Sequence, residues 1–522
     1  MAIFESAPKI DGQQQTLPAM RSAGVCLHVT SLPGRYGIGE IGQHALRFVD
    51  MLQEMQLGAW QILPTGPTAY GDSPYQPLST YAGNELLIDV AGLLELRLLR
   101  SNEARALEHL PEFTVDYGVL IPQKTALLKL AASRFAATAN STLKAECDDF
   151  FEYNDAEWLH DYALFRILKS LHGERPWPDW DTDYVHREDP AMRKLESAAR
   201  TEIEAVKIIQ FLFHHQWRRF REYANEHGIT LFGDMPIYIA LDSADTWSNR
   251  EILQIDENGR PENVAGVPPD YFSEDGQLWG NPLYAWDKHA ANGYRWWVER
   301  LRAAAKLVDI VRLDHFRGFE AYWSVPADSD TARVGAWIKG PGDAIFDALQ
   351  DALGRLPIVA EDLGVITPEV EALRERHNIP GMVVLQFGAA DENFDLDQVV
   401  ENCVCYTGTH DNDTTIGWFN GSPEDIRSAH EIEATQQAVL ELTDGTPETI
   451  HTDLIKAAFS TDARLAIAPL QDYLGLGSEA RINTPGTSGN NWRWRVTEDQ
   501  LNEGFCEHVA ELVLASGRGL AG

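Results

Sequence analysis

The segment VDIVRLDHF, residues 308–316, decides the fold of this 522-residue chain. It is a short apolar run that ends in an acid, Asp314, and it carries Arg312 two positions earlier. An apolar run of this length is typical of a strand that is buried on both faces of a parallel sheet. Because parallel barrels keep their chemistry at the C-terminal ends of their strands, the segment predicts that Asp314 lies at the mouth of a barrel.

Two later segments repeat this design at strand-sized intervals. PIVAEDL, residues 357–363, reaches Glu361, and CVCYTGTHDN, residues 403–412, reaches Asp411. We expect both carboxylates to converge with Asp314 at one barrel mouth. Carboxyl groups that flank a glycosidic bond are what its cleavage requires, so the pattern favours sugar chemistry.

The same alternation of strand and helix runs through most of the chain. Candidate strands cover residues 24–30, 59–64, 230–235, 308–314, 357–362, 381–387, 403–407 and 464–470. Helical patterns separate most of them, for example at residues 44–56, 293–306, 341–353, 368–377 and 450–459. This repetition predicts an α/β fold, a (β/α)8 TIM barrel.

Two interruptions divide the predicted barrel. Residues 91–223, between the second and third strands, have helical patterns almost throughout and predict an inserted helical subdomain. Residues 243–287, after the third strand, are rich in Gly, Pro, Asn and aromatics and predict a long lid loop. The catalytic barrel is then expected over residues 21–90 and 224–522, with residues 1–20 as a loose arm.

Composition excludes several classes of partner. With 43 basic and 79 acidic residues, the net charge of −36 argues against nucleic acid and anionic membranes and is compatible with a neutral substrate. No apolar stretch reaches the ~18 residues of a membrane span, and the polar N-terminal segment has no signal core. Five cysteines, few and odd in number, fit a reducing compartment, so we expect a cytoplasmic protein, with a plastid as the alternative.

Each acid also has a structural explanation. Arg312 and Asp314 share one face of a strand. There the arginine would hold the carboxylate of Asp314 ionised and oriented, as a nucleophile needs. The alternative is that the two residues form a structural ion pair that caps the barrel. Glu361 stands beside Asp362, and crowding raises the pKa of one such carboxyl, which suits a general acid. We assign the role of general acid to Glu361 and a local structural role to Asp362.

His410 and Asp411 follow a buried strand and can bind sugar hydroxyls, and Asp411 can also stabilise positive charge. A metal site is the alternative for this pair. No second cluster of ligands has a recognisable spacing, so no metal is predicted.

The segment GIGEIG, residues 37–42, matches the dinucleotide-binding fingerprint by letter. The loop before it is too long for a tight strand-to-helix turn, and no acid ends the following strand. A glycine-rich barrel loop is the better interpretation.

Aromatic residues interleave with Asp, Asn and Gln in two loops, residues 69–81 and 266–282. Rings cover the apolar faces of sugars and the polar groups bind hydroxyls, so two such loops near one mouth favour glycan binding. Packing of the loops onto the barrel is the alternative for any single ring.

Taken together, these segments resemble the amylomaltases, the disproportionating 4-α-glucanotransferases of glycoside hydrolase family 77 in the α-amylase clan. The resemblance runs from residue 21 to residue 495. It is carried by residues 24–42, 60–87, 232–247, 264–286, 308–326, 358–370, 406–418 and 482–495.

The resemblance implies a role for each matching residue. Asp314 is expected as the nucleophile, Glu361 as the acid/base and Asp411 as the stabiliser of the transition state. The residues expected to bind substrate are Arg312, His410, Tyr75, Asp234, Asp270, Tyr271, Trp279 and Asn281.

The expected reaction is transfer of an α-1,4-glucan segment to the 4-hydroxyl of another glucan or of glucose. The partners are therefore α-1,4-glucans and maltooligosaccharides, with glucose as an acceptor, and no cofactor is implied. An α-1,4-glucan hydrolase of the same clan is the alternative, because it shares all three carboxylates.

Overall fold

Eight parallel strands form the central sheet in the described part of the computed structural model. They are β1 (Ser22–Cys26), β2 (Ala59–Gln61), β3 (Thr230–Met235), β6 (Ile310–Leu313), β9 (Ile358–Ala360), β10 (Gly381–Val384), β11 (Cys403–Tyr406) and β12 (Leu465–Pro469). The structure describes residues 16–269, 273–391, 393–422, 425, 427–487 and 489–520.

The strand order is β10-β11-β12-β1-β2-β3-β6-β9, and every neighbouring pair is parallel. The N–H of Ala360 in β9 donates to the carbonyl of Pro380, just before β10, at 2.8 Å, so the two edges meet and nearly close the barrel. All eight predicted strands are confirmed. Most end earlier than predicted, because residues such as Val29–Ser31 turn into a 3-10 helix at the barrel mouth.

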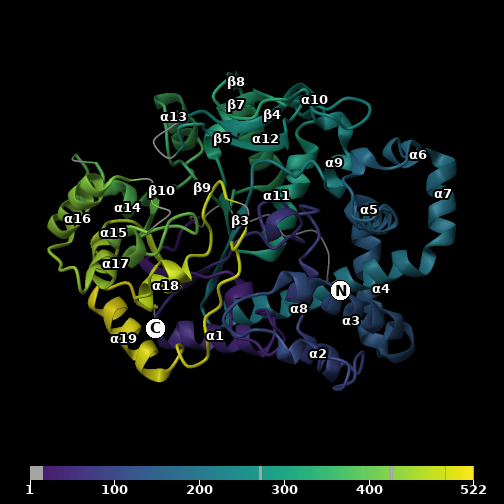
Figure 1. The fold of residues 1–522 in the computed structure, drawn as a ribbon, viewed down its shortest axis with the longest axis horizontal. Helices are drawn as coiled ribbons and strands as arrows, with labels where there is room; N and C mark the ends of the chain where they lie inside the picture. The colour runs from purple at the N-terminus through teal and green to yellow at the C-terminus, as the bar shows by residue number, and fades with distance from the viewer. Residues whose placement is uncertain are drawn as a thin grey trace.

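Helices surround this sheet (Figure 1). The longer ones beside the barrel are α1 (Gln43–Glu54), α8 (Arg200–Glu226), α11 (Arg295–Leu307), α12 (Asp343–Leu353), α13 (Pro368–Arg376), α16 (Ala429–Thr443), α17 (Ile450–Ser460) and α19 (Glu503–Ala515). Short helices are α9 (Ala244–Ser248), α10 (Trp286–Ala291), α14 (Leu385–Gly388), α15 (Thr415–Asn420) and α18 (Leu470–Tyr473). In α1 the buried residues 45, 48, 49 and 52 recur at helical spacing, which gives the helix one apolar face for the sheet.

The segment between β2 and β3 is helical. It contains α2 (Val90–Glu95), α3 (Tyr117–Thr138), α4 (Ser141–Asn154), a π-helical turn (Asp155–Leu159), α5 (His160–Leu171), α6 (Thr182–Val185) and α7 (Asp189–Ala198). α8 then runs through residue 223 and packs on α1 and β3. The boundaries of a separate subdomain at residues 91–223 therefore remain a prediction.

The expectation of an irregular lid loop at residues 243–287 was incomplete. This segment contains β4 (Asn263–Val267) and β5 (Gln277–Pro282), which join β7 (Ala321–Pro326) and β8 (Ala336–Lys339) in an antiparallel sheet ordered β5-β4-β7-β8. This small sheet lies at the top of Figure 1. The segment's Gly- and Pro-rich composition hid the strands, and one partner of β4, the strand β7, comes only after β6 in the chain.

The glycine-rich loop at residues 37–42 leads from β1 to α1 and packs against the helical segment. A Cβ on Gly39 would lie 1.8 Å from the carbonyl of Val29, so close backbone packing requires glycine there. Glu40 in this loop forms an ion pair with Lys124 of α3, whose side chain is fully buried. The loop therefore has a packing role that explains its composition.

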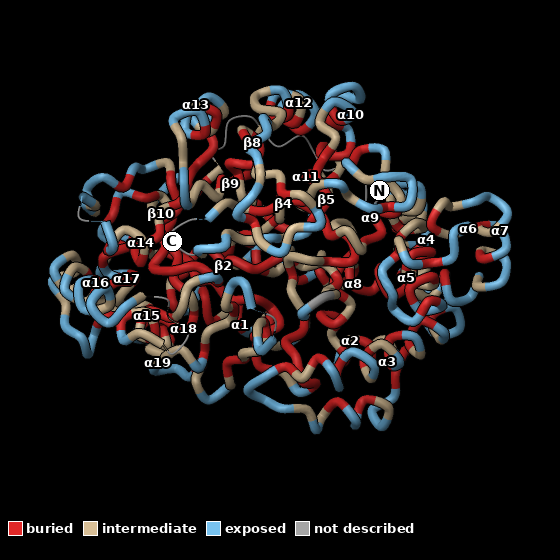
Figure 2. The backbone as a smooth tube through the Cα atoms, turned by 45° about the horizontal axis from the view of Figure 1, so that its top comes forward, coloured by how far each residue is buried: buried red, intermediate tan, exposed pale blue. Residues whose placement is uncertain are grey.

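Inside the barrel, the polar site lies next to the apolar core, on the side of the C-terminal ends of the strands. One buried apolar cluster contains a residue from every strand, including Phe232 of β3 and Ile310 of β6. Because side chains two positions apart share a face, Asp234 and Arg312 follow them on the inward face, one layer nearer the mouth. Figure 2 shows the buried backbone concentrated along these central strands. Among the described helices, none is both long enough and apolar enough to span a membrane.

Candidate active site

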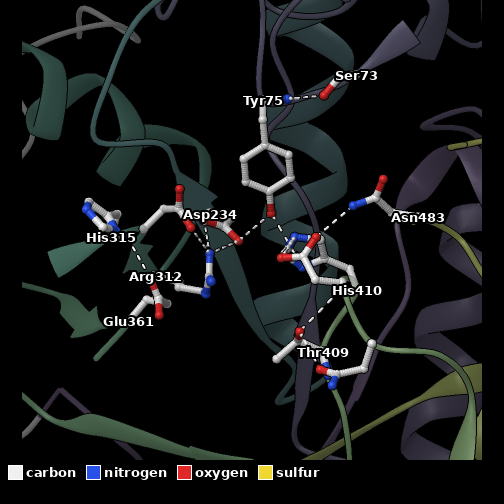
Figure 3. Close-up of polar contacts among 12 residues, drawn as sticks. Ser73, Tyr75, Asp234, Arg312, His315, Glu361, Thr409, His410 and Asn483 are labelled. Atoms are coloured by element: carbon white, nitrogen blue, oxygen red, sulfur yellow. Dashed lines mark hydrogen bonds and ion pairs between the residues drawn. The ribbon is translucent and has the colours of Figure 1, made fainter. Parts of the chain in front are cut away.

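Arg312 is the centre of the polar site (Figure 3). Its Nη1 donates to both carboxylate oxygens of Asp234, at 3.0 and 2.9 Å, and to Oδ1 of Asp314 at 2.8 Å. β3 and β6 pair with Asp234 opposite Arg312, so the strand register itself sets this contact. Burial alone would lower the pKa of Arg312, but Asp234 and Asp314 raise it well above its ordinary value.

Asp234 has a different environment from the one expected of a substrate-binding residue. Its side chain is fully buried under Arg312 and accepts a hydrogen bond from the Tyr75 hydroxyl at 2.9 Å. Burial raises the pKa of Asp234, while the guanidinium of Arg312 opposes this rise. In this structure Asp234 therefore orients the side chains of Arg312 and Tyr75 by accepting hydrogen bonds from both.

Asp314 stands one residue beyond the end of β6, where its N–H donates to the carbonyl of Met235 at 3.1 Å. Its side chain is 27% exposed, in contrast to the 4% of Arg312. The guanidinium holds Oδ1, and Oδ2 has no hydrogen-bond partner among the described residues. One oxygen is thus oriented by the protein and the other is available to a ligand.

Glu361 stands one residue beyond the end of β9. Its Oε2 accepts the N–H of His315 at 2.8 Å, and its Oε1 accepts the N–H of Leu363 at 3.0 Å. Burial raises the pKa of Glu361 to about 7, helped by the charge of Asp314 and opposed by Arg312. A carboxyl with this pKa exchanges its proton near neutral pH, which is what general acid–base catalysis needs.

His315 has a left-handed backbone, with φ of 51°. Few residues other than glycine adopt this conformation, and here it accompanies the hydrogen bond from the His315 N–H to Glu361. Burial lowers the pKa of the His315 imidazole to about 4. The sequence analysis did not identify this residue, because a turn that begins right after Asp314 gives no periodic signal.

His410 and Asp411 follow β11, as predicted. His410 Nε2 lies 3.3 Å from Oδ2 of Asp411, and Asn483 donates through Nδ2 to Oδ1 of Asp411 at 2.7 Å. Asn483 comes from the segment after β12, 72 residues along the chain. It was missed because nothing in its local sequence links it to Asp411.

Tyr75 connects the two halves of the site (Figure 3). Its hydroxyl bonds to Asp234, and its ring stacks on His410 with centroids 5.0 Å apart and planes within 15°. Trp492 packs against both rings, at 5.9 Å from Tyr75 and 6.1 Å from His410. A continuous chain of contacts therefore runs from Asp411 to the Arg312 cluster.

Two residues of the second aromatic loop, Trp279 and Asn281, lie at the edge of this site. Trp279 of β5 meets His315 edge-on, with ring centroids 4.9 Å apart. Asn281 is buried, with its amide bound to the carbonyl of Ile239 at 2.9 Å and to the amide of Gln76 at 3.2 and 3.4 Å. In this structure Asn281 holds the second aromatic loop, residues 266–282, against the first, residues 69–81, through its contact with Gln76.

Two expected binding residues, Asp270 and Tyr271, lie outside the described residues. Of the other nine predicted site residues, seven form one connected group: Tyr75, Asp234, Arg312, Asp314, Glu361, His410 and Asp411.

This arrangement defines a class. A (β/α)8 barrel with an oriented, accessible carboxylate, a carboxyl that titrates near pH 7 and a third carboxylate at the same mouth is an enzyme that acts on glycosidic bonds.

Comparison with known proteins gives the family. The sequence profile described as 4-alpha-glucanotransferase matches residues 27–501. The chain belongs to this family and has 4-α-glucanotransferase activity.

Relatives match over nearly their whole length. The 4-alpha-glucanotransferase of a Synechocystis strain is 45% identical over 95% of this chain and 98% of its own, and that of Thermus thermophilus is 45% identical over 94% and 97%. A solved structure, the amylomaltase from Streptococcus agalactiae in complex with acarbose, superposes with a TM-score of 0.90 at 34% identity, covering 96% of this chain and 100% of that one.

Proposed function

We propose that Asp314 is the nucleophile, Glu361 the acid/base and Asp411 the transition-state stabiliser in the transfer of α-1,4-glucan segments. The observation that carries this assignment is the pair formed by an oriented, accessible Asp314 and a Glu361 whose pKa is raised to about 7. The two carboxyls of such a retaining pair are expected about 5–5.5 Å apart.

In the first step, Oδ2 of Asp314 attacks the anomeric carbon of the bound glucan. The bond from this carbon to the glycosidic oxygen breaks, and Glu361 gives its proton to that oxygen. The departing chain leaves with a free 4-hydroxyl, and a covalent glycosyl ester remains on Asp314. Asp411 stabilises the positive charge that develops on the sugar ring.

In the second step, Glu361 accepts the proton of an incoming 4-hydroxyl, whose oxygen attacks the anomeric carbon and releases Asp314. Ester formation helps this change of role. Asp314 loses its negative charge in the ester, and that charge is one cause of the raised pKa of Glu361, so this pKa falls and the carboxylate form gains. Each step inverts the anomeric carbon, so the new bond is again α-1,4.

The substrates that we propose are α-1,4-glucans and maltooligosaccharides, with glucose as an acceptor. His410 and Asp411 would bind hydroxyls, and the rings of Tyr75 and Trp279 would cover sugar faces. Asp270 and Tyr271 are kept as proposed binding residues. Five buried, free cysteines support a reducing compartment, the cytoplasm or a plastid, which cell fractionation would test.

The experiment is incubation of the pure protein with maltotriose and separation of the products over time. We expect glucose and a ladder of longer maltooligosaccharides, with little gain in reducing ends. Glucose and maltose alone, with reducing ends rising, would mean that water is the acceptor and that the chain is a hydrolase.

A further inference from the structure

Asp472 is a buried acid that takes no part in the proposed reaction. It belongs to α18, the single helical turn that follows β12 at the barrel mouth, and it is only 1% exposed. Its carboxylate forms no ion pair with a described residue, and burial raises its pKa. An acid without a cation partner is costly to bury, so its hydrogen bonds must offset that cost.

The hydrogen bonds that this carboxylate accepts from the described residues come from the two ends of one segment. Thr407, the first residue after β11, donates through its hydroxyl to Oδ2 at 2.7 Å. Thr415, the first residue of α15, donates through its hydroxyl to Oδ2 and through its N–H to Oδ1, both at 2.7 Å. α15 and α18 lie close together in Figure 1. Asp472 therefore joins the beginning of the 407–415 segment to its end.

The 407–415 segment carries His410 and Asp411. Its middle is a tight turn, in which Oδ1 of Asn412 accepts the N–H and the hydroxyl hydrogen of Thr409, both at 2.9 Å. The oxygen of the same hydroxyl accepts the N–H of Asp411 at 3.3 Å. A turn that is closed by its own side chains keeps its shape, so the place of Asp411 in the site depends on how the two ends of the segment are held.

Two further contacts hold the segment from the same part of the chain. Asn483 donates to Oδ1 of Asp411 at 2.7 Å, and Ser478 donates through its hydroxyl to Oδ2 of Asp413 at 2.7 Å. Like α18, both donors follow β12 in the chain. The segment begins at the end of β11, but residues that follow β12 fix its position.

We propose that Asp472 is a positioning residue for glucan transfer: it holds both ends of the 407–415 segment and so places the carboxylate of Asp411 beside the charge that develops in the transition state. The inference rests on the proposed role of Asp411. Because Asp472 is buried, it acts through Asp411 and not on the glucan itself. A catalytic group displaced by about 1 Å can cost about 10²-fold in rate, so the loss of Asp472 should fall on kcat.

The test compares initial rates of glucose release from maltotriose for Asp472→Ala and Asp472→Asn. Alanine removes every side-chain contact with the segment, so kcat should fall about tenfold to a hundredfold, with a smaller change in KM. Asparagine should restore kcat to within about threefold of the native value, because its oxygen still accepts the N–H of Thr415 and its amide N–H groups can donate to the two threonine hydroxyls.

Asp453→Ala is the matched control, because this acid of α17 also accepts a backbone N–H and a hydroxyl hydrogen, from Thr446 and Thr449. It holds none of the site residues, so its loss should lower the melting temperature without changing kcat. Thermal melting of each variant shows whether it is folded. If Asp472→Ala does not fold, Thr407→Val removes one hydrogen bond at nearly constant side-chain size and should lower kcat about threefold to tenfold.

A kcat for folded Asp472→Ala within about twofold of the native value, or a loss that asparagine does not restore, would overturn the proposal. An unchanged kcat for Thr407→Val would do the same where that variant replaces Asp472→Ala. Asp411→Ala separates this result from failure of the proposed function. If Asp411→Ala loses glucose release while Asp472→Ala keeps it, the inference about Asp472 alone fails. Native rates for Asp411→Ala would overturn the proposed role of Asp411 and, with it, that of Asp472.

Discussion

Asn483→Ala is the variant that tests most directly how Asp411 is held. The amide of Asn483 donates to Oδ1 of Asp411 at 2.7 Å, and Asn483 is only 8% exposed, so water does not readily replace it. A hydrogen bond to a charged group contributes about 1.5–3 kcal/mol. Since about 1.4 kcal/mol corresponds to a factor of ten in rate, its loss should lower kcat about tenfold to a hundredfold.

The effect should fall on kcat more than on KM. Asp411 is proposed to stabilise charge that develops only in the transition state, so a misplaced Asp411 costs more there than in the substrate complex. The assay is the initial rate of glucose release from maltotriose across a range of concentrations. Thr487→Ala is the control, because this exposed hydroxyl in the same segment bonds to the Thr484 carbonyl and not to Asp411.

A kcat for Asn483→Ala within twofold of the native value, with an unchanged melting temperature, would refute this reasoning. It would mean either that Asp411 keeps its position without the amide or that Asp411 does not act on the developing charge.

Four further predictions follow from the contacts above. Asp314→Asn should abolish glucose release from maltotriose while leaving glucan binding largely intact by calorimetry; native turnover would place the nucleophile elsewhere. Since Glu361 must carry a proton in the free enzyme and its pKa is raised to about 7, kcat/KM should fall as pH rises above about 7; a pH profile of kcat/KM that stays flat to pH 9 would contradict this role of Glu361. Glu361→Gln should lower the rate about 10²–10⁴-fold. Lys124→Met leaves Glu40 buried without its ion-pair partner, so the free energy of unfolding measured with denaturant should fall by about 3–5 kcal/mol at pH 8. At pH 5 the fall should be smaller, because Glu40, whose pKa is about 7, takes up a proton there. Equal falls at both pH values would disprove the mechanism. Trp279→Ala should raise the ratio of hydrolysis to transfer, measured as reducing ends gained per glucose released, by opening the site to water; an unchanged ratio would remove this ring from the explanation.

The catalytic segments were predictable because their information is local. In a buried parallel strand the apolar run and the acid at its end stand next to each other, so the position of Asp314 or Glu361 at the mouth follows from the chain itself. The eight strands were found for the same reason. The small antiparallel sheet was missed, because β4 and β5 are short strands in a segment rich in Gly and Pro, and β4 also pairs with β7, about 60 residues later in the chain.

The sequence by itself determined the barrel, the three acids and their order along the chain, since each depends on a few neighbouring residues. Only the tertiary structure decided how those acids are held. The burial of Asp234 under Arg312 comes from strand register, the contact of Asn483 with Asp411 spans 72 residues, and the pKa of Glu361 depends on burial and on charges from another strand. Such properties arise from distances between groups that are remote in sequence, which no local pattern encodes.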